Sequence, residues 1–275
     1  MMVHMKRLLL LNLLFLTAVG CKRPPDAPDT LDDLASYLYE HVMDDEEYLV
    51  AGIDNLETWL SEDNEAEEFE TNLDSTAEGY TVTNLSEEAV VSLDGVERDL
   101  NNLLGAAVGY DIDLEVEQVI DALIGRDMME VFPGNYQSYE RTFEDEADRD
   151  CFLDGECDSI QFEIRVVADY PLNLTVDAES VVQYRRVELE DGRKAVVQRT
   201  WMSKPGEANV DWIQLEQQYF LAVHLPQKSG MRRVEAMWVK ASLGNTPVPE
   251  DMALSLTVDT MRDTGKNLEA YFESL

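Results

Sequence analysis

Three cysteines, Cys21, Cys151 and Cys157, offer the clearest chemistry in this chain. Cys151 and Cys157 flank a short segment that contains Asp154-Gly155, a turn that can bring the two thiols together. A redox pair is disfavoured, because the spacing is not Cys-x-x-Cys and no cation between the cysteines lowers a thiol pKa. We therefore predict a disulfide that pins an exposed loop. A ring this short stabilises the fold by only ~2 kcal/mol, because it removes little chain entropy.

Acidic side chains crowd the same loop and could offer oxygen ligands to calcium. The candidate set is Asp148, Asp150, Asp154, Glu156 and Asp158. Their intervals do not match those of an EF-hand loop. We favour an acidic surface loop without a metal, and calcium binding is the alternative.

Candidates for catalysis are few. Of the three histidines, His4 falls in a leader that export would remove, which leaves His41 and His224. The sequence contains neither His-Glu-x-x-His nor Gly-x-Ser-x-Gly. His41 lies near a run of acids and is expected at the surface. His224 alternates against Leu221, Val223 and Leu225, so we expect it at an edge or facing outward. We favour a protein that is not an enzyme and expect no cofactor. An enzyme of unrecognised type is the alternative, because a catalytic pair of carboxylates cannot be picked out among 57 acidic residues.

The charge is strongly one-sided, with 57 acidic and 21 basic residues and a net charge of −36. Nucleic-acid binding requires clustered Lys and Arg that displace phosphate counterions, so we exclude a nucleic-acid partner. The acidic excess favours a solvating surface, and a dedicated cation site is the alternative. With 45% hydrophobic residues, the chain has enough apolar material for a core.

The first twenty residues have the pattern of an export signal. Lys6 and Arg7 precede an apolar run, Leu8 to Val19, that is too short to span a bilayer. The segment Ala18-Val19-Gly20-Cys21 resembles a bacterial lipobox, although Ala18 stands where Leu, Val or Ile is usual. That resemblance implies a lipoprotein in which Cys21 carries palmitate-type lipid and anchors the chain to a membrane. Simple secretion with a free Cys21 is the alternative.

Cysteine parity supports the lipoprotein interpretation. If Cys21 is lipidated, Cys151 and Cys157 remain as one pair, which fits an oxidising compartment. Lys22 follows the cysteine where many lipoproteins retained in the inner membrane have Asp. By that resemblance we place the protein in the cell envelope, at the outer membrane.

The mature chain changes character near Pro133-Gly134. Before this point, apolar spacing predicts helices at 30–42, 49–60, 85–104 and 116–123. For these helices we predict Thr30 as an N-cap, Asn84 with Glu87 as a capping box, and Asp111 or Asp113 as a third cap. We divide the chain into a signal peptide (1–20), a lipidated tether (21–29), an acidic helical region (30–73) and an α+β domain (74–275).

After Gly134 the apolar period becomes two, which predicts an antiparallel sheet from about 135 to 243. Asp191-Gly192 is the strongest hairpin signal, and Pro226 to Gly230 join two long strands. A C-terminal helix follows, although Leu254 to Val258 could instead form a strand. Its predicted buried stripe is Val258, Met261, Leu268, Phe272 and Leu275. Gly265 in this stripe either allows close approach to the sheet or marks a kink.

Two further groups of residues lie in the sheet half. A basic group comprises Arg185, Arg186, Arg193, Lys194 and Arg199. We favour cross-strand pairing with Glu188 and Glu190, and docking on the acidic helices or on an anionic envelope partner is the alternative. The aromatic residues Trp201, Trp212, Trp238, Tyr219 and Phe220 are expected in the core.

The predicted class is α+β, with an acidic helical region, a meander of about six antiparallel strands and a C-terminal helix. Over residues 79–275 this element order resembles the START-like helix-grip superfamily. The resemblance implies a curved sheet around a long helix and a cavity for apolar ligands, and it carries over no individual residue.

We favour an envelope lipoprotein that acts as a non-enzymatic interaction or structural module. The alternative is binding of an apolar ligand in a helix-grip cavity. The expected partners are accordingly a membrane, reached through the lipid anchor, and either another envelope protein or an apolar small molecule. The interior of the sheet should discriminate between these functions.

Overall fold

The computed structural model describes residues 26–61, 79–82, 85–170, 173–244 and 246–275. The predicted signal segment 1–20, Cys21 and Asn84 lie outside the described residues, as does the acidic stretch 62–70. Among the described helices, none is long and apolar enough to span a membrane.

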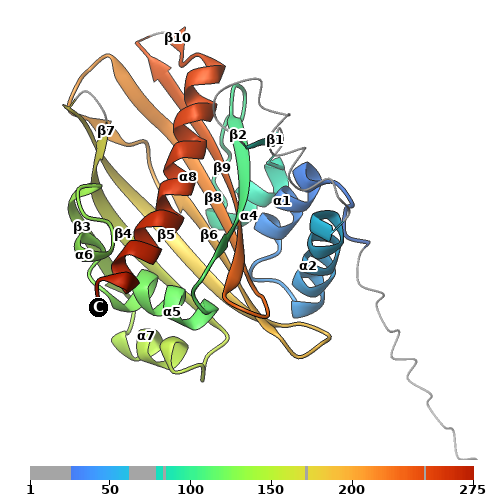
Figure 1. Ribbon diagram of the computed structural model, residues 1–275. Helices are drawn as coiled ribbons and strands as arrows, with labels where there is room; N and C mark the ends of the chain where they lie inside the picture. The colour runs from blue at the N-terminus through green and yellow to red at the C-terminus, as the bar shows by residue number, and fades with distance from the viewer. Residues whose placement is uncertain (1–25, 62–78, 83–84, 171–172, 245) are drawn as a thin grey trace, which may run out of the picture.

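In these described ranges, one antiparallel sheet of ten strands runs through the molecule (Figure 1). Its order is β1-β2-β9-β8-β6-β5-β4-β3, with β10 beside β9 and β7 beside β5. The strands are β1 (Tyr80–Val82), β2 (Leu104–Ile112), β3 (Tyr136–Phe143), β4 (Ser159–Tyr170), β5 (Leu174–Glu188), β6 (Lys194–Met202), β7 (Glu207–Ala208), β8 (Ile213–Pro226), β9 (Met231–Leu243) and β10 (Thr246–Pro247).

The predicted six-stranded meander is confirmed. Strands β3, β4, β5, β6, β8 and β9 are the long strands after Gly134, and each pairs with the next. Gly192 has a φ of +83°, so the Asp191-Gly192 turn uses the left-handed conformation that glycine tolerates. The sheet also includes β1 and β2, which precede the point where the apolar period changes.

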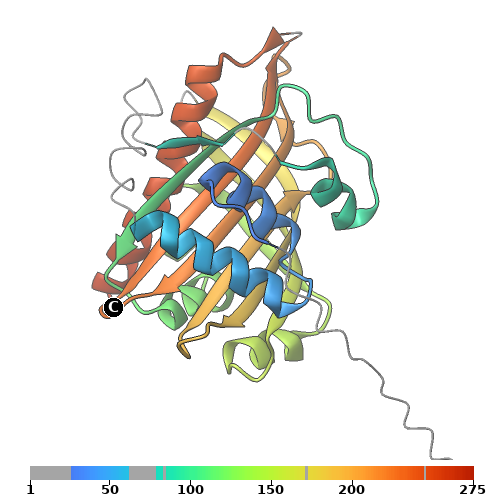
Figure 2. The same ribbon diagram turned by 90° about the vertical axis from the view of Figure 1, so that its right-hand side faces the viewer.

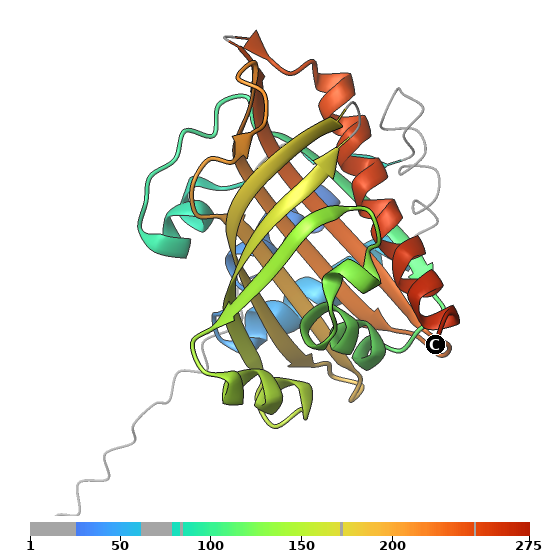
Figure 3. The same cartoon turned by 90° about the vertical axis from the view of Figure 1, so that its left-hand side faces the viewer.

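Helices cover both faces of this curved sheet. The bounds of those discussed are α1 (Leu31–Glu40), α2 (Glu46–Ser61), α4 (Glu87–Asp94), α5 (Val116–Ile120), the π-helix η1 (Asp121–Gly125), α6 (Met128–Val131), α7 (Glu146–Leu153) and α8 (Glu250–Glu273). Helices α1 and α2 pack on the outer face (Figure 2). Helix α8 lies on the inner face, around which β3 to β5 curl (Figure 3). Helices α5 and α7 close one end of that face.

The outer core joins the N-terminal helices to the sheet. Thr30 caps α1 as predicted, because its hydroxyl accepts a hydrogen bond from the Asp33 amide. The predicted stripes of α1 and α2 are buried, with Leu34 and Ile53 fully enclosed. Both helices share one apolar cluster with Trp238 of β9.

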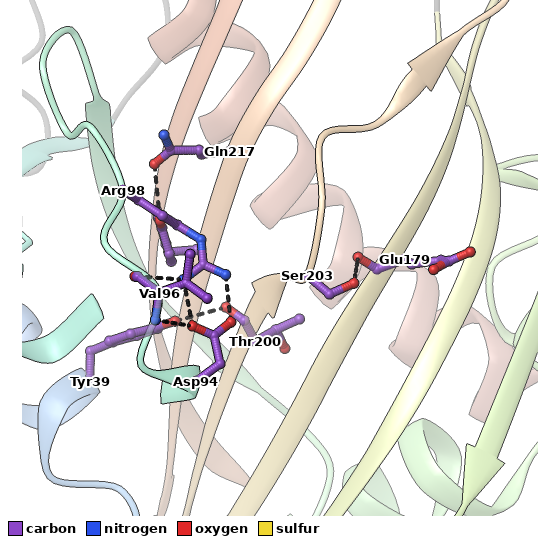
Figure 4. A network of polar contacts seen from close by, with 9 residues as sticks. Tyr39, Asp94, Val96, Arg98, Glu179, Thr200, Ser203 and Gln217 are labelled. Carbon is purple, nitrogen blue, oxygen red and sulfur yellow. Dashed lines mark hydrogen bonds and ion pairs between the residues drawn. The ribbon is translucent and has the colours of Figure 1, made fainter. Parts of the chain in front are cut away.

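Polar contacts order the segment after α4 and connect α1 to the sheet (Figure 4). Arg98 forms an ion pair with Asp94 at 2.5 Å, and this hydrogen bond lowers the pKa of the Asp94 carboxyl. The Tyr39 hydroxyl of α1 donates to the Thr200 carbonyl of β6 at 3.2 Å. These contacts connect α1 to β6 and hold the turn that follows α4.

The predicted helix 85–104 is wrong beyond Asp94. Ser86 is the N-cap of α4, and the helix ends at Gly95, whose φ is +73°. Residues Leu104 to Ile112 form strand β2 instead, between β1 and β9. A Cβ at Gly105 would lie 2.5 Å from the Trp238 side chain, so the small residues of this segment serve close packing in the sheet.

The next predicted helix begins at Val116 as expected, but its cap and its end differ from the prediction. Its N-cap is Glu115, whose backbone amide donates to the Gln118 side chain at 2.9 Å, so neither Asp111 nor Asp113 caps it. Helix α5 then continues as the π-helix η1. Arg141 of β3 donates to the carbonyls of Leu123 and Arg126 and satisfies the end of η1.

The C-terminal helix α8 is continuous from Glu250, which excludes a strand at Leu254 to Val258. Its predicted stripe is buried at Val258, Met261 and Leu268, half-buried at Phe272, and 79% exposed at Leu275. A Cβ at Gly265 would lie 2.4 Å from the Tyr110 ring, so this glycine allows close approach and marks no kink.

The basic group does not pair as we favoured. Arg193 binds Glu57 of α2 at 2.7 Å, and Arg199 donates to the Tyr39 and Glu40 carbonyls at the end of α1. Arg186 pairs with Glu117 of α5. These three arginines therefore hold helices against the sheet, because helices rather than solvent cover both faces.

The aromatic residues are in the core with one exception. Trp201, Trp238 and Tyr219 are buried, and Phe220 is half-buried. Trp212 is 53% exposed, contrary to expectation, because it precedes β8 in the loop after β7.

Candidate functional site

The two cysteines of the acidic loop are joined. The Cys151–Cys157 disulfide links Cα atoms 5.3 Å apart, and Gly155, with a φ of +72°, makes the turn between them. Cys151 lies in α7, whose end the disulfide ties to the segment before β4. The bridge therefore supports the closed end of the inner face.

The five candidate calcium ligands do not form a site. Asp148 and Asp150 lie on α7, Asp154 caps its end, and Asp158 lies just before β4. In the part of the chain that the structure describes, no three His, Cys, Asp or Glu side chains are placed to hold a metal ion. Asp148 and Asp150 are two residues apart on α7, so the helical backbone directs their side chains differently.

Polar side chains gather instead on the inner face of the central strands. In the register of the sheet, Arg233 of β9 lies between Tyr110 of β2 and His224 of β8. Glu235 is two residues beyond Arg233 and therefore faces the same side. We call Tyr110, His224, Arg233 and Glu235 the inner polar cluster.

Arg233 and Glu235 form a buried ion pair. The Arg233 Nε and Glu235 Oε1 atoms are 2.5 Å apart, and the side chains are 2% and 0% exposed. Burial raises the pKa of Glu235, and the adjacent Arg233 guanidinium opposes that shift. The Tyr110 hydroxyl donates to the Met261 carbonyl of α8 at 3.2 Å, which ties the helix to this cluster.

His224 completes the cluster and corrects the outward-facing prediction. The side chain is fully buried, because β8 is a central strand whose two faces are both covered. Neither ring nitrogen has a hydrogen-bond partner among the described residues. Burial, reinforced by the Arg233 charge, lowers the pKa of His224 well below its usual value. The imidazole is therefore neutral at pH 7.

Tyrosines extend this polar character across the inner face. Burial raises the pKa of Tyr184 on β5 and of Tyr139 on β3. Tyr184 stacks on Phe162 at a centroid distance of 6.1 Å, and Arg141 lies 5.0 Å from the centroid of the Tyr139 ring. These rings belong to the same apolar cluster as Leu268 of α8.

Away from the cluster the inner face becomes apolar and more accessible. Phe220, Val239 and Ile164 face the same side but are only half-buried. A pocket of about 170 Å³ opens between β2, β9 and the start of α8. Its apolar lining is Leu104, Val239, Ala241, Val248 and Ala253. The inner face thus carries a buried polar cluster on β2, β8 and β9 and, nearer the start of α8, a small pocket with a mostly apolar lining.

The outer surface carries a larger, acidic cleft of about 930 Å³ beside α2. Carboxylates dominate its lining, among them Glu46, Asp54 and Glu188. Burial, together with Glu190 and Glu57, raises the pKa of Asp54. This cleft fits the solvating acidic surface that the composition predicts.

Comparisons with known proteins give a likeness of fold only. No family model matches the chain, and no curated protein matches it. A START superfamily protein from Mycobacterium smegmatis is 12% identical, with a TM-score of 0.40 over 62% of this chain and 97% of that one. A STAR-related lipid transfer protein fragment from Xanthomonas axonopodis is 12% identical, with a TM-score of 0.44 over 71% and 98%. Human STARD10 is 11% identical, with a TM-score of 0.40 over 77% and 81%.

Proposed function

We propose that the inner face of the sheet binds a small molecule that is apolar over most of its length and polar at one end. The observation that carries this proposal is the fully buried His224 beside Arg233 on the inner face, whose ring nitrogens have no hydrogen-bond partner among the described residues. Buried polar atoms in proteins are normally hydrogen-bonded, to protein, water or ligand. An apolar pocket with a few convergent polar groups is the usual form of a small-molecule site.

The energetics favour binding over a purely structural role for this cluster. An ion pair buried in a core is often no more stabilising than apolar side chains of similar volume. A buried histidine without hydrogen bonds costs additional free energy. A chain selected only for stability gains nothing from these residues, whereas a bound polar group can use them. The interaction-module function that we favoured from the sequence stays a prediction.

Binding can be measured with N-phenyl-1-naphthylamine, a neutral apolar dye whose fluorescence rises in apolar surroundings. We expect saturable binding to the wild-type protein. Ile164→Trp adds bulk to the inner face, where Ile164 is half-buried, and should weaken dye binding by about tenfold.

The matched control is Glu163→Trp, which places the same side chain on the exposed face of the same strand. This variant should bind the dye like the wild type. Equal affinities of the two tryptophan variants, or the absence of saturable binding to the wild type, would refute a binding site on the inner face.

A further inference from the structure

We infer that His224 makes the fold open in mild acid: when its imidazole takes up a proton, helix α8 separates from the inner face of the sheet. We call the form with α8 packed on the sheet the closed form. The inference needs no ligand, so it holds or fails independently of the proposed function. It follows from the burial of His224, from the charge beside it and from the way α8 is attached.

The imidazole of His224 has nothing to support a charge in the closed form. The residue is 0% exposed, and neither ring nitrogen has a hydrogen-bond partner among the described residues. A protonated imidazole has two N–H donors, and both require acceptors. Because a buried charge without partners is strongly unfavourable, protonation requires that water reach the ring.

The groups on the neighbouring strands add to this cost. Arg233 of β9 lies opposite His224 in the register of the sheet, and its guanidinium is the charge that acts on the imidazole. The carboxylate of Glu235 is already paired with Arg233. Tyr110 of β2 and Tyr184 of β5 are neutral, because burial raises their pKa values. A proton on His224 would therefore leave two cations and one carboxylate in the inner polar cluster.

The remaining elements packed against this part of the sheet do not compensate a second cation. On β6 the residue opposite His224 is apolar. The carboxylate of Glu117 on α5 binds Arg186, and Glu269 of α8 accepts a hydrogen bond from the Asp113 amide at 3.3 Å. Burial and Arg233 are the effects that act on the pKa of His224, and both lower it.

The pH range of the opening follows from the linkage between protonation and folding. An exposed imidazole takes up a proton near pH ~6.5, whereas the pKa of His224 in the closed form lies well below that value. The open form therefore binds the proton more readily, and the closed form loses stability as the pH falls below about 6.5. One proton shifts the opening equilibrium by about tenfold per pH unit in this range.

Helix α8 is the covering element whose attachment involves the inner polar cluster itself. Tyr110 interacts electrostatically with Glu235, and its hydroxyl donates to the Met261 carbonyl of α8. Helix α5 is attached differently, since two nitrogens of Arg186 bind the Glu117 carboxylate outside the cluster. We therefore expect α8, rather than α5, to separate when the cluster gains a charge.

Hydrogen exchange followed by mass spectrometry tests this inference on the full chain. We would compare α8 with α1, which packs on the opposite face, at pH 7.5 and pH 5.5 after correction for the chemical exchange rate at each pH. The opening constant of α8 should be about tenfold larger at pH 5.5, because one proton is taken up on opening. The opening constant of α1 should change little.

His224→Phe keeps a planar ring that cannot be protonated, so α8 of this variant should open equally at both pH values. The matched control is His41→Phe, which replaces a partly exposed histidine at the end of α1 and should keep the tenfold response. An equal response of the wild type and His224→Phe would overturn the inference, as would an equal response of α8 and α1.

NMR of the histidine rings in the wild-type protein gives a second measurement that needs no variant to fold. The ring signal of His224 should keep its neutral-form shift while α8 is protected, and the charged form should appear only as α8 opens. A His224 signal that titrates near pH ~6.5 while α8 stays protected would also overturn the inference.

Discussion

Replacing Arg233 with Met is expected to lower the free energy of unfolding by about 3–5 kcal/mol, because it leaves the buried Glu235 carboxylate without its cation. The double variant Arg233→Met/Glu235→Leu should recover most of this loss, since it removes both charges and fills the space with apolar atoms. Denaturant midpoints and slopes of the two variants give the comparison.

An exposed ion pair supplies the control. Arg165 binds Asp177 at 2.8 Å with 58% of its side chain exposed, so Arg165→Met should cost no more than about 1 kcal/mol. If Arg233→Met were as mild as Arg165→Met, the inner polar cluster would be well hydrated rather than dry. The argument that a bound polar group can use these buried residues would then fail.

Ending the chain at Val258 is expected to destabilise the fold by more than about 5 kcal/mol. The truncation removes Met261 and Leu268, which are buried and contribute about 1.5–3 kcal/mol each by burial. It also uncovers Val108 of β2 and Met237 of β9, which pack in the same cluster as Met261. The loss of a cooperative thermal transition would be the visible result.

Deleting only Ser274 and Leu275 is the control for this truncation. Leu275 is 79% exposed, and Ser274 follows the last residue of α8. Stability should therefore stay close to that of the full chain. If the long truncation retained the full-length midpoint, packing of α8 on the inner face would be refuted, and the proposed site with it.

The meander was predictable because its signals are local. Alternating apolar residues define each strand, and Asp191-Gly192 fixes a hairpin whose glycine adopts a positive φ. The helix α8 was predictable for the same reason, since its stripe repeats at three and four residues. Strand β2 was missed because Leu100, Leu103 and Leu104 continue a helical spacing, and only packing against Trp238 reveals why Gly105 is needed.

The candidate site could be predicted only in part. Strand alternation places Arg233 and Glu235 on the same side as Met237. Alternation alone does not show which face of the sheet is enclosed, and in this sheet helices cover both faces. His224 was therefore expected to face outward, although it occupies a central strand. Its proximity to Arg233 depends on the register between β8 and β9, which is a long-range property of the fold.

The most direct test of the binding site is a titration of methyl-¹³C-methionine protein with 1-decanol, followed by NMR. Met202 of β6 and Met237 of β9 face the inner side of the sheet. Met43 and Met129 are exposed and lie outside these strands. The account predicts saturable shifts and intermolecular NOEs at Met237 and Met202, with Met43 and Met129 unchanged. Shifts confined to Met43 and Met129, or no shifts up to the solubility limit of 1-decanol, would contradict it.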